Sequence, residues 1–393
     1  MTDRGLLEEL HTALATFEGN ICGRISSWPG LGELRRRSFP EQLRSRTHMH
    51  PWRELVRLVA LRLGWHGLVE PERGWACVDR VYDALDRATA RAALEHRPQA
   101  VYCYEDGALH TFLAAKQLRT ICLYDLPIGY WRAARHILTE EADRRPEWAS
   151  TLGGLKDSEA KLARKDEELR LADRILVAST FTKSTLEKCP FPLAPVSVIP
   201  YGADDAAAGV KGISRRSAQE GPLRVLFVGG LSQRKGIADL FEAMRMIGAH
   251  AELTVIGRKS AEACAALDVA LGKHRWIERL AREKILQEMR AHDVLVFPSL
   301  FEGFGLVVTE ALSQGIPVIT TPHTCGPDLL TEGEDGFIVP IRDPQAIAGK
   351  LELLHRDRSR LAAMSDAARK KAEGLMWADY RRRIVEVVEN SCI

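Results

Sequence analysis

Apolar and polar positions alternate in long blocks through the second half of the chain. Short apolar runs, typical of strands buried on both faces, occupy residues 223–228, 252–256, 294–297 and 317–320. Helical stretches separate these runs, at residues 237–247, 260–271, 280–290 and 306–314. Because strands that alternate with helices form a doubly wound parallel sheet, we expect an α/β domain here.

The first half is less regular but predicts strands of the same kind. They lie at residues 100–104, 120–124, 174–179 and 196–200, and a charged helix spans residues 157–172. The start differs, because residues 5–10 look like the end of a helix and only a short strand follows near residues 10–17. We therefore expect a Rossmann-like domain without its opening strand, either because the strand is absent or because the start used lies too far downstream. Such a gap would expose strand edges and apolar surface.

A change in composition divides the chain. Residues 206–221 are mostly small or polar and show no apolar periodicity, which predicts a linker. We expect residues 1–205 to form one Rossmann-like domain and residues 222–375 another, the two facing a cleft. Residues 376–393 then form a C-terminal helix that can cross back to the first domain.

Composition narrows the class of protein. The 393 residues are 46% hydrophobic and 27% charged, as in ordinary globular proteins, and the length suits two domains. A net charge of +2 argues against nucleic acid as a partner, and no apolar run approaches the ~20 residues of a membrane span. The acidic start lacks a signal peptide, and the eight cysteines include no CxxC pair. We expect a cytoplasmic protein without disulfide bonds or zinc.

The segment from residue 297 to residue 310 carries the strongest chemical signal. Glu302 lies in a turn after an apolar strand, and Glu310 lies eight residues later on the next helix. Gly303 and Gly305 leave backbone N–H groups open to a ligand, and the helix start adds a positive dipole end. This combination suits phosphate oxygens, with a hydroxyl acceptor on either side, as a nucleotide sugar requires. The plain alternative is two solvated glutamates on an ordinary strand, turn and helix.

The segment resembles the E-x7-E motif of retaining glycosyltransferases with the GT-B fold, in particular glycosyltransferase family 4. The resemblance continues through residues 315–321, a buried strand after a glycine helix stop, and then through the Gly326-Pro327-Asp328 turn, residues 336–340 and Asp343-Pro344. It implies transfer of a hexose-type sugar from a nucleoside-diphosphate sugar to a saccharide or lipid-linked saccharide, with retention, in bacterial polysaccharide or glycolipid assembly. It also implies that neither a metal nor a cofactor is needed.

The resemblance assigns roles in the second domain. Lys235 corresponds to a lysine that reaches the donor diphosphate, and Gly230 stands where a basic residue usually helps, so Arg234 is the candidate to replace that residue. Glu310 would bind the ribose and Glu302 the sugar ring, without acting as a nucleophile. The remaining residues of the expected donor site are Arg258, Gly303, Phe304, Gly305 and Leu306. Solvated surface positions are the plain alternative for Lys235, Arg234 and Arg258.

In the first domain the family often carries a histidine after a strand that enters the cleft. Tyr124 and Asp125 stand there instead, and we expect Asp125 to contact sugar or acceptor hydroxyls, or else to cap the following turn. Three further residues are expected on the acceptor side: Glu105, Asp106 and Tyr130. The plain alternatives are a helix cap for Glu105 and Asp106 and an ordinary buried aromatic side chain for Tyr130.

Other functions stay open at this point. A nucleotide-sugar epimerase on the same fold would need acid and base side chains that we do not find. A dinucleotide-dependent oxidoreductase would need a G-x-G-x-x-G turn, which is missing after the strand at residues 223–228. A catalytically silent relative that binds nucleotide sugars is the third alternative.

The segment from Arg35 to Arg57 is basic and aromatic, which suggests peripheral contact with anionic membrane or, more simply, a solvated surface. His48 and His50 have a spacing that could ligate a metal, but no carboxylate or thiol pattern supports such a site.

Overall fold

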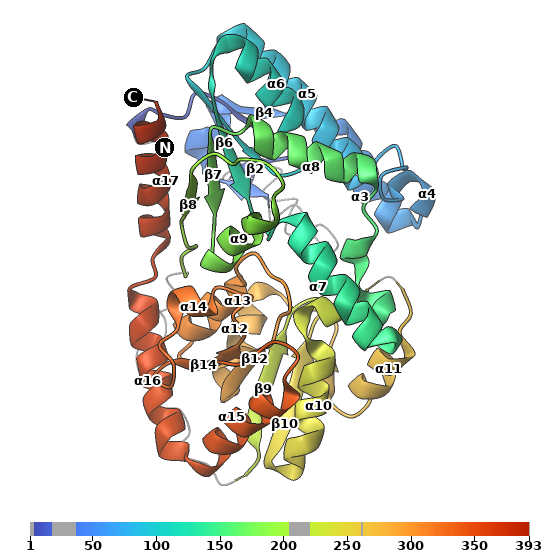
Figure 1. Ribbon diagram of the computed structural model, residues 1–393, viewed down its shortest axis with the longest axis vertical. Helices are drawn as coiled ribbons and strands as arrows, with labels where there is room; N and C mark the ends of the chain where they lie inside the picture. Colours follow the sequence, from blue (N-terminus) through green and yellow to red (C-terminus); the bar gives the residue numbers. More distant parts are fainter. Residues whose placement is uncertain (1–3, 18–36, 204–220, 261, 393) are drawn as a thin grey trace.

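Two α/β domains lie one above the other in the computed structural model, which describes residues 4–17, 37–203, 221–260 and 262–392 (Figure 1). A four-stranded sheet forms the centre of the first domain and a six-stranded sheet the centre of the second. Neighbouring strands in both sheets run parallel. The expected architecture of two Rossmann-like domains is confirmed.

The second-domain sheet has the strand order β11-β10-β9-β12-β13-β14. Its strands are β9 (Leu223–Val228), β10 (Ala251–Ile256), β11 (Arg275–Ile277), β12 (Val294–Phe297), β13 (Val318–Thr320) and β14 (Gly336–Ile338). In chain order this is the 3-2-1-4-5-6 arrangement of dinucleotide-binding folds. The order reverses between β9 and β12, and ligands of such sheets bind outside the carboxyl ends of the strands at that point.

Helices cover this sheet. They are α10 (Ile237–Ile247), α11 (Ala265–Leu271), α12 (Arg282–Ala291), α13 (Leu306–Ser313), α14 (Gly326–Leu329), α15 (Pro344–Arg356) and α16 (Arg358–Glu373). Helix α10, whose predicted bounds are confirmed, begins after Gly236 and ends before Gly248, two glycines with positive φ of 68° and 60°. Its apolar side chains are buried in the core of the second domain.

The first-domain sheet has the order β5-β6-β7-β8. Its strands, all predicted, are β5 (Ala100–Tyr104), β6 (Ile121–Leu126), β7 (Arg174–Val177) and β8 (Val196–Val198). The helices are α3 (Trp52–Leu63), α4 (His66–Val69), α5 (Val78–His96), α6 (Leu109–Leu118), α7 (Trp131–Arg144), α8 (Glu159–Leu171) and α9 (Thr180–Thr185). The predicted charged helix is α8, and Ser158 caps it by accepting a hydrogen bond from the Lys161 backbone N–H.

The start of the chain differs from expectation. No helix is present at residues 5–10, where that prediction is wrong. The strand expected near residues 10–17 is two short strands, β1 (Leu10–Thr12) and β2 (Thr16–Phe17). They pair in parallel with β4 (Thr47–Met49) and β3 (Ser38–Phe39), so neither belongs to the four-stranded sheet.

The last helix, α17 (Trp377–Ser391), lies against the first domain (Figure 1). Its Ile384 packs with Leu123, Leu176 and Ile199, which come from β6, β7 and the segment after β8. The chain returns beside its own outward path, because the Ala203 N–H donates to the Leu375 carbonyl at 2.7 Å.

Two further details correct or limit the predictions. The helical stretch expected at residues 260–271 forms a helix only at Ala265–Leu271. The linker prediction falls almost wholly outside the described residues, and so do Arg35 and Arg36 of the basic segment.

Candidate donor site and domain interface

Buried aromatic side chains support the turn that carries Glu302. Phe297, Phe301 and Phe304 are buried, so their rings fix the backbone while Glu302 stays partly exposed. Gly305 precedes α13 with φ of 94°, and a Cβ there would lie 2.9 Å from the Phe297 ring. Glycine is therefore needed at this position for both conformation and space.

Lys235 and Arg234 meet Glu302 across the point where the strand order reverses. The basic pair lies in a 3-10 turn after β9, and Glu302 follows β12. The Lys235 ammonium contacts the Glu302 carboxylate directly, and the Arg234 guanidinium lies 3.5 Å from it. Arg234 also donates to the Phe301 carbonyl at 2.7 Å. The structure thus brings together three of the residues expected around the donor, Lys235, Arg234 and Glu302.

This cluster places an excess of positive charge in a nearly closed space. The side chains of Lys235 and Glu302 are 13% and 14% exposed. Burial, followed by the neighbouring Arg234 charge, lowers the pKa of Lys235 to about 6. The direct contact with Glu302 acts the other way, and we assign Lys235 the charged form because that contact favours it.

Glu310 has a different partner. It lies on α13 and accepts hydrogen bonds at 3.1 Å from Arg282, at the start of α12. Arg282 was not predicted from the sequence, although a basic residue at the first position of a helix after the Glu278–Ala281 loop is an accessible clue.

The other predicted donor residues surround the same carboxyl edge of the sheet. Gly230 is exposed, and a Cβ there would meet no atom within 4 Å. Its loop runs beside that of Arg258, because the Leu231 N–H donates to the Arg258 carbonyl. The Arg258 side chain is exposed, and so is Leu306 at the start of α13. Phe304 turns its ring into the core against Tyr201, so only its backbone faces the turn.

Asp125 does not join this group in the structure. It is 4% exposed and accepts a hydrogen bond from the Tyr102 hydroxyl. Its neighbours in a very small cavity include Tyr201 and, from α17, Tyr380. Burial raises the pKa of Asp125 to about 6, although the Tyr102 hydrogen bond lowers it. A role in contacting sugar stays a prediction that these contacts do not support.

The predicted acceptor-side residues converge on α8. The Glu105 carboxylate lies 3.3 Å from Lys165, and Asp106 lies 2.8 Å from Arg164. Burial raises the pKa of Glu105 to about 7, although Lys165 lowers it.

Two buried tyrosines complete this network on α8. Tyr124 donates to Glu168 at 3.1 Å, and Tyr130 donates to Asp166 at 2.6 Å. These residues therefore form one polar network inside the first domain, and an acceptor role for them stays a prediction.

His48 and His50 lie in a stack with His11, whose ring nitrogens contact Glu9 and His50 at 2.9 and 3.2 Å. Within the described ranges, no group of three or more His, Cys, Asp or Glu side chains has an arrangement that could hold a metal ion. In the same ranges, no helix is both long and apolar enough to cross a bilayer.

Comparison with solved structures identifies the architecture. Sucrose-phosphate synthase from Thermosynechococcus elongatus superposes with a TM-score of 0.62 over 82% of this chain and 81% of its own, at 19% identity. Anabaena Alr3699/HepE in complex with UDP and glucose gives 0.61 over 78% and 81%, at 18% identity. The chain has the GT-B fold. Identity at this level supports the fold alone.

Sequence comparison places the GT-B signal in the second domain. Residues 213–371 match the family described as Glycosyl transferases group 1. The amylovoran biosynthesis glycosyltransferase AmsK of Erwinia amylovora is 30% identical over 171 residues, which cover 40% of this chain and 42% of AmsK. Glycogen synthase of Mycobacterium tuberculosis is 26% identical over 283 residues, 70% of this chain and 64% of the synthase. The chain therefore spans less than two thirds of these relatives.

The two GT-B domains touch directly at the Glu302 turn. The Gly303 carbonyl accepts hydrogen bonds from Ser179 and Thr182 at 2.6 and 2.8 Å. A Cβ on Gly303 would lie 1.8 Å from the Pro127 carbonyl oxygen. The sequence analysis missed Ser179 and Thr182, because a hydroxyl at the end of β7 reads as an ordinary cap for α9.

A second set of contacts joins α7 of the first GT-B domain to α10 of the second. Asp239, which is 1% exposed, accepts hydrogen bonds from Arg144, Arg145 and Gln233. Gln233 also donates to Glu141 at 2.7 Å, and it directly precedes Arg234 in the chain. The turn that carries the basic pair is thus anchored to both domains.

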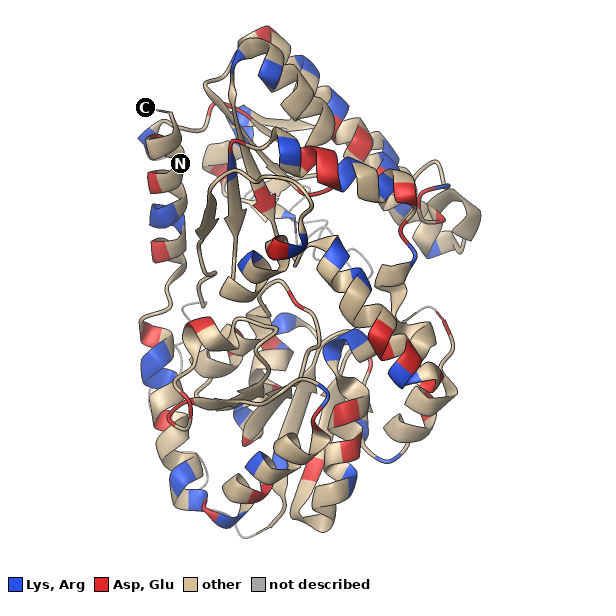
Figure 2. Cartoon of the chain, in the orientation of Figure 1, with Lys and Arg blue, Asp and Glu red and all other residues tan. Residues whose placement is uncertain are grey.

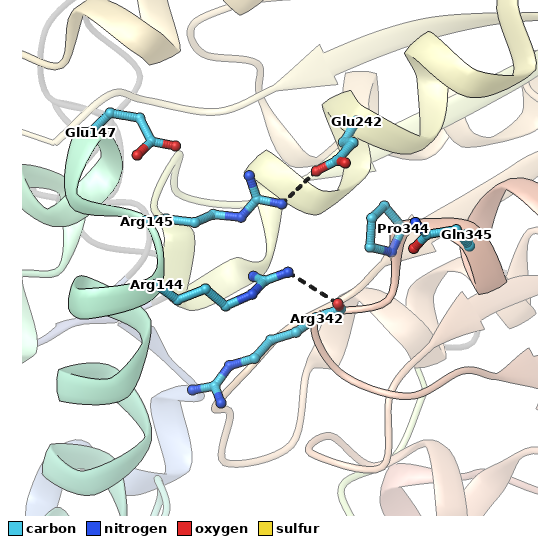
Figure 3. Close-up of a pocket in the computed structure, with 7 residues that line it drawn as sticks. All are labelled: Arg144, Arg145, Glu147, Glu242, Arg342, Pro344 and Gln345. Atoms are coloured by element: carbon cyan, nitrogen blue, oxygen red, sulfur yellow. Dashed lines mark hydrogen bonds and ion pairs between the residues drawn. The ribbon is translucent and has the colours of Figure 1, made fainter.

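Beside this network lies a cavity of about 260 Å³ lined by polar groups (Figure 3). Arg144, at the end of α7, extends toward the backbone carbonyl of Arg342, and the next residue, Arg145, extends toward Glu242 of α10. The figure draws both contacts. Since each arginine here is paired with carboxylates or carbonyls, the network holds the domains together and leaves little free charge for a ligand.

Proposed function

We propose that this protein is a glycosyltransferase that moves a hexose-type sugar from a nucleoside-diphosphate sugar to a hydroxyl acceptor. The observation that carries the proposal is the meeting of Lys235, Arg234 and Glu302 at the switch point of the second-domain sheet. The Glycosyl transferases group 1 match over this domain supports it. The names of relatives in amylovoran, colanic acid and capsular polysaccharide biosynthesis support a role in bacterial polysaccharide assembly.

Each side chain then has a role in binding the donor. Lys235 and Arg234 neutralise the diphosphate, and the N–H groups at the start of α13 bind its oxygens. Glu310 accepts hydrogen bonds from the ribose hydroxyls, and Glu302 accepts one from a hydroxyl of the sugar ring. Transfer leaves extra negative charge on the nucleoside diphosphate, which fixed cations stabilise most in a site with little water.

The proposed reaction retains the anomeric configuration without a protein nucleophile. The bond from the anomeric carbon to the diphosphate oxygen breaks while the acceptor oxygen bonds to that carbon on the same face. The acceptor proton passes to the departing phosphate oxygen. We expect no metal requirement, so transfer should persist in EDTA.

The donor class is tested by titrating the protein with UDP, GDP and ADP and by following hydrolysis of the matching sugar nucleotides. UDP is the first candidate, because solved structures of HepE contain UDP and UDP-glucose. Lys235→Ala and Glu310→Ala should each weaken diphosphate binding at least about tenfold, since each removes a charge-assisted contact. Lys370→Ala, on an exposed part of α16, is the matched control and should bind normally.

The outcomes separate the alternatives. Diphosphate binding without hydrolysis or transfer to any saccharide would indicate the catalytically silent relative. Conversion of the donor to another sugar nucleotide would indicate an epimerase. Binding of none of the three diphosphates would contradict the proposal.

The acceptor, a saccharide or a lipid-linked saccharide, stays a prediction. Peripheral contact with an anionic membrane, at the cytoplasmic face, is a prediction as well.

A further inference from the structure

Helix α3 buries charge and exposes apolar side chains, the reverse of a typical surface helix. Glu54 is 3% exposed and binds Arg57 on the same helix and Arg37 from outside it. Trp52 and Val59, by contrast, are 78% and 50% exposed. The ion pairs of Glu54 occupy the face of α3 that is turned toward the protein, and the exposed apolar side chains lie on the outer face.

The exposed side chains form a stripe. Positions 52, 55, 59 and 63 follow helical spacing and share one face of α3. Trp65 lies two residues after the end of α3. Trp75 lies beside the helix, with the Arg53 guanidinium 4.5 Å from the centre of its ring. We call the side chains of Trp52, Leu55, Val59, Leu63, Trp65 and Trp75 the α3 patch; each is exposed.

The α3 patch is exceptional within this molecule. More than half of the exposed large hydrophobic side chains in the described ranges lie between residues 49 and 82. Helix α4, at the right edge of the first domain, carries no Lys, Arg, Asp or Glu and is tan in Figure 2. A concentration of this kind marks an interaction surface rather than the scattered exposure of ordinary proteins.

The charges around the patch indicate which partner covers it. Between residues 49 and 82 the exposed charged side chains are Arg62, Arg73, Arg80 and a single acid, Glu70, which lies 3.5 Å from Arg73, so the exposed charge is net positive. Tryptophan and arginine beside aliphatic side chains are typical of segments that lie in the headgroup region of a bilayer. A second copy of the chain fits less well, because a twofold interface would place this basic surface against itself.

We propose that the α3 patch docks this protein on an anionic lipid bilayer, with its tryptophans and aliphatic side chains in the headgroup region and its arginines on lipid phosphates. The inference does not depend on the sugar-transfer chemistry. It gives the surface by which the first domain would meet an acceptor at a membrane.

The test is co-sedimentation of the full chain with vesicles of phosphatidylcholine alone or mixed with phosphatidylglycerol, at low and high salt. We expect binding to the mixed vesicles, weakened by salt, and much less binding to the neutral ones. The double variant Trp52→Ser/Val59→Ser should bind roughly tenfold more weakly, because two side chains no longer enter the bilayer.

Matched controls make the test specific. Met246→Ser/Val269→Ser replaces two exposed apolar side chains of the second domain and should bind like the unmodified protein. Arg62→Gln/Arg73→Gln should lose the preference for anionic vesicles.

Three outcomes would overturn the proposal. They are no binding to mixed vesicles at low salt, equal binding by the Trp52→Ser/Val59→Ser variant, and a dimer in solution that this variant dissociates. The last would mean that a second copy covers the patch.

Discussion

Glu302 lies where it competes with the ligand that its neighbours would bind. Its carboxylate is the counterion of Lys235 and lies 3.5 Å from Arg234, so a diphosphate that uses both cations must displace it. The carboxylate would then be free to accept a sugar hydroxyl. In this arrangement the cations are neutralised before the donor arrives.

Glu302→Gln should therefore bind nucleoside diphosphate several-fold more tightly than the unmodified protein at pH 6, while transferring sugar more slowly. Burial and Arg234 lower the pKa of Lys235 to about 6, and the substitution removes the carboxylate that opposes them. In the Glu302→Gln variant, diphosphate binding restores the charge of Lys235 by proton uptake. The affinity of this variant for the diphosphate should therefore fall as the pH rises from 6 to 8. Calorimetric titration at both pH values measures this.

Glu310→Gln provides the contrast, since Glu310 has Arg282 as its partner instead of Lys235. It should weaken binding at both pH values. Equal affinity of Glu302→Gln and the unmodified protein at pH 6 would contradict the competition.

Asp125 gives a second prediction for a single residue. Its pKa is raised from 3.8 to about 6, so it stabilises the fold at low pH, and that contribution is lost as the pH rises from about 4 to 6. The loss is of order 3 kcal/mol. Asp125→Asn carries no charge to desolvate, so its stability relative to the unmodified protein should rise between pH 4.5 and 7.5 in urea unfolding. An unchanged difference across that range would contradict this account.

At the scale of elements, the sequence predicts every strand of the first-domain sheet and the interior strands of the second, but it misses the edge strand β11. Strands β9 and β12 are continuous apolar runs because they are buried on both faces. The edge strand β11 was missed, since Arg275 and Trp276 are exposed and leave no apolar run to recognise. The E-x7-E segment located Glu302 and Glu310 from its glycines and spacing, whereas Lys235 was assigned through the resemblance to family 4.

The placement of Asp125 shows what spacing cannot provide. Alternate residues of β6 face opposite sides of the sheet, and the side that is closed depends on α17, more than 250 residues later. A strand alone does not reveal which of its faces a distant helix will cover.

Helix α17 is predicted to contribute to the stability of the domain that it crosses to. Ile384→Ala should lower the free energy of unfolding by about 2–4 kcal/mol, because it leaves a void among Leu123, Leu176 and Ile199. Arg383→Ala, one residue earlier and exposed, should change it by less than about 0.5 kcal/mol. Thermal or urea unfolding of both variants measures the difference, and equal values would contradict the packing.

At the scale of the whole molecule, two contacts hold the domains in this arrangement. One joins the Gly303 carbonyl to Ser179 and Thr182, and the other is the buried network around Asp239. Both lie next to the residues that would bind the donor, so the position of one domain on the other sets the space at the Glu302 turn.

Asp239→Asn should destabilise the protein by roughly 1.5–3 kcal/mol, because it removes a buried carboxylate that Arg144 and Arg145 share, although Glu141 and Glu242 still pair with these arginines. Asp379→Asn breaks an exposed pair with Arg382 and should cost about 0–1 kcal/mol. Urea unfolding compares the stabilities, and small-angle scattering shows whether the domains separate. A cost for Asp239→Asn as small as that of the control would contradict a stabilising role for the network.

The return of the chain to its first domain bears on how the molecule can be divided. A fragment of residues 221–393 would carry α17 without the strands that cover Ile384, and would present this side chain to solvent. A fragment that ends at Gly374 would lack this exposed apolar surface. The first domain, in turn, should gain solubility when residues 377–391 are supplied as a separate peptide, since this piece of its core comes from a much later part of the chain.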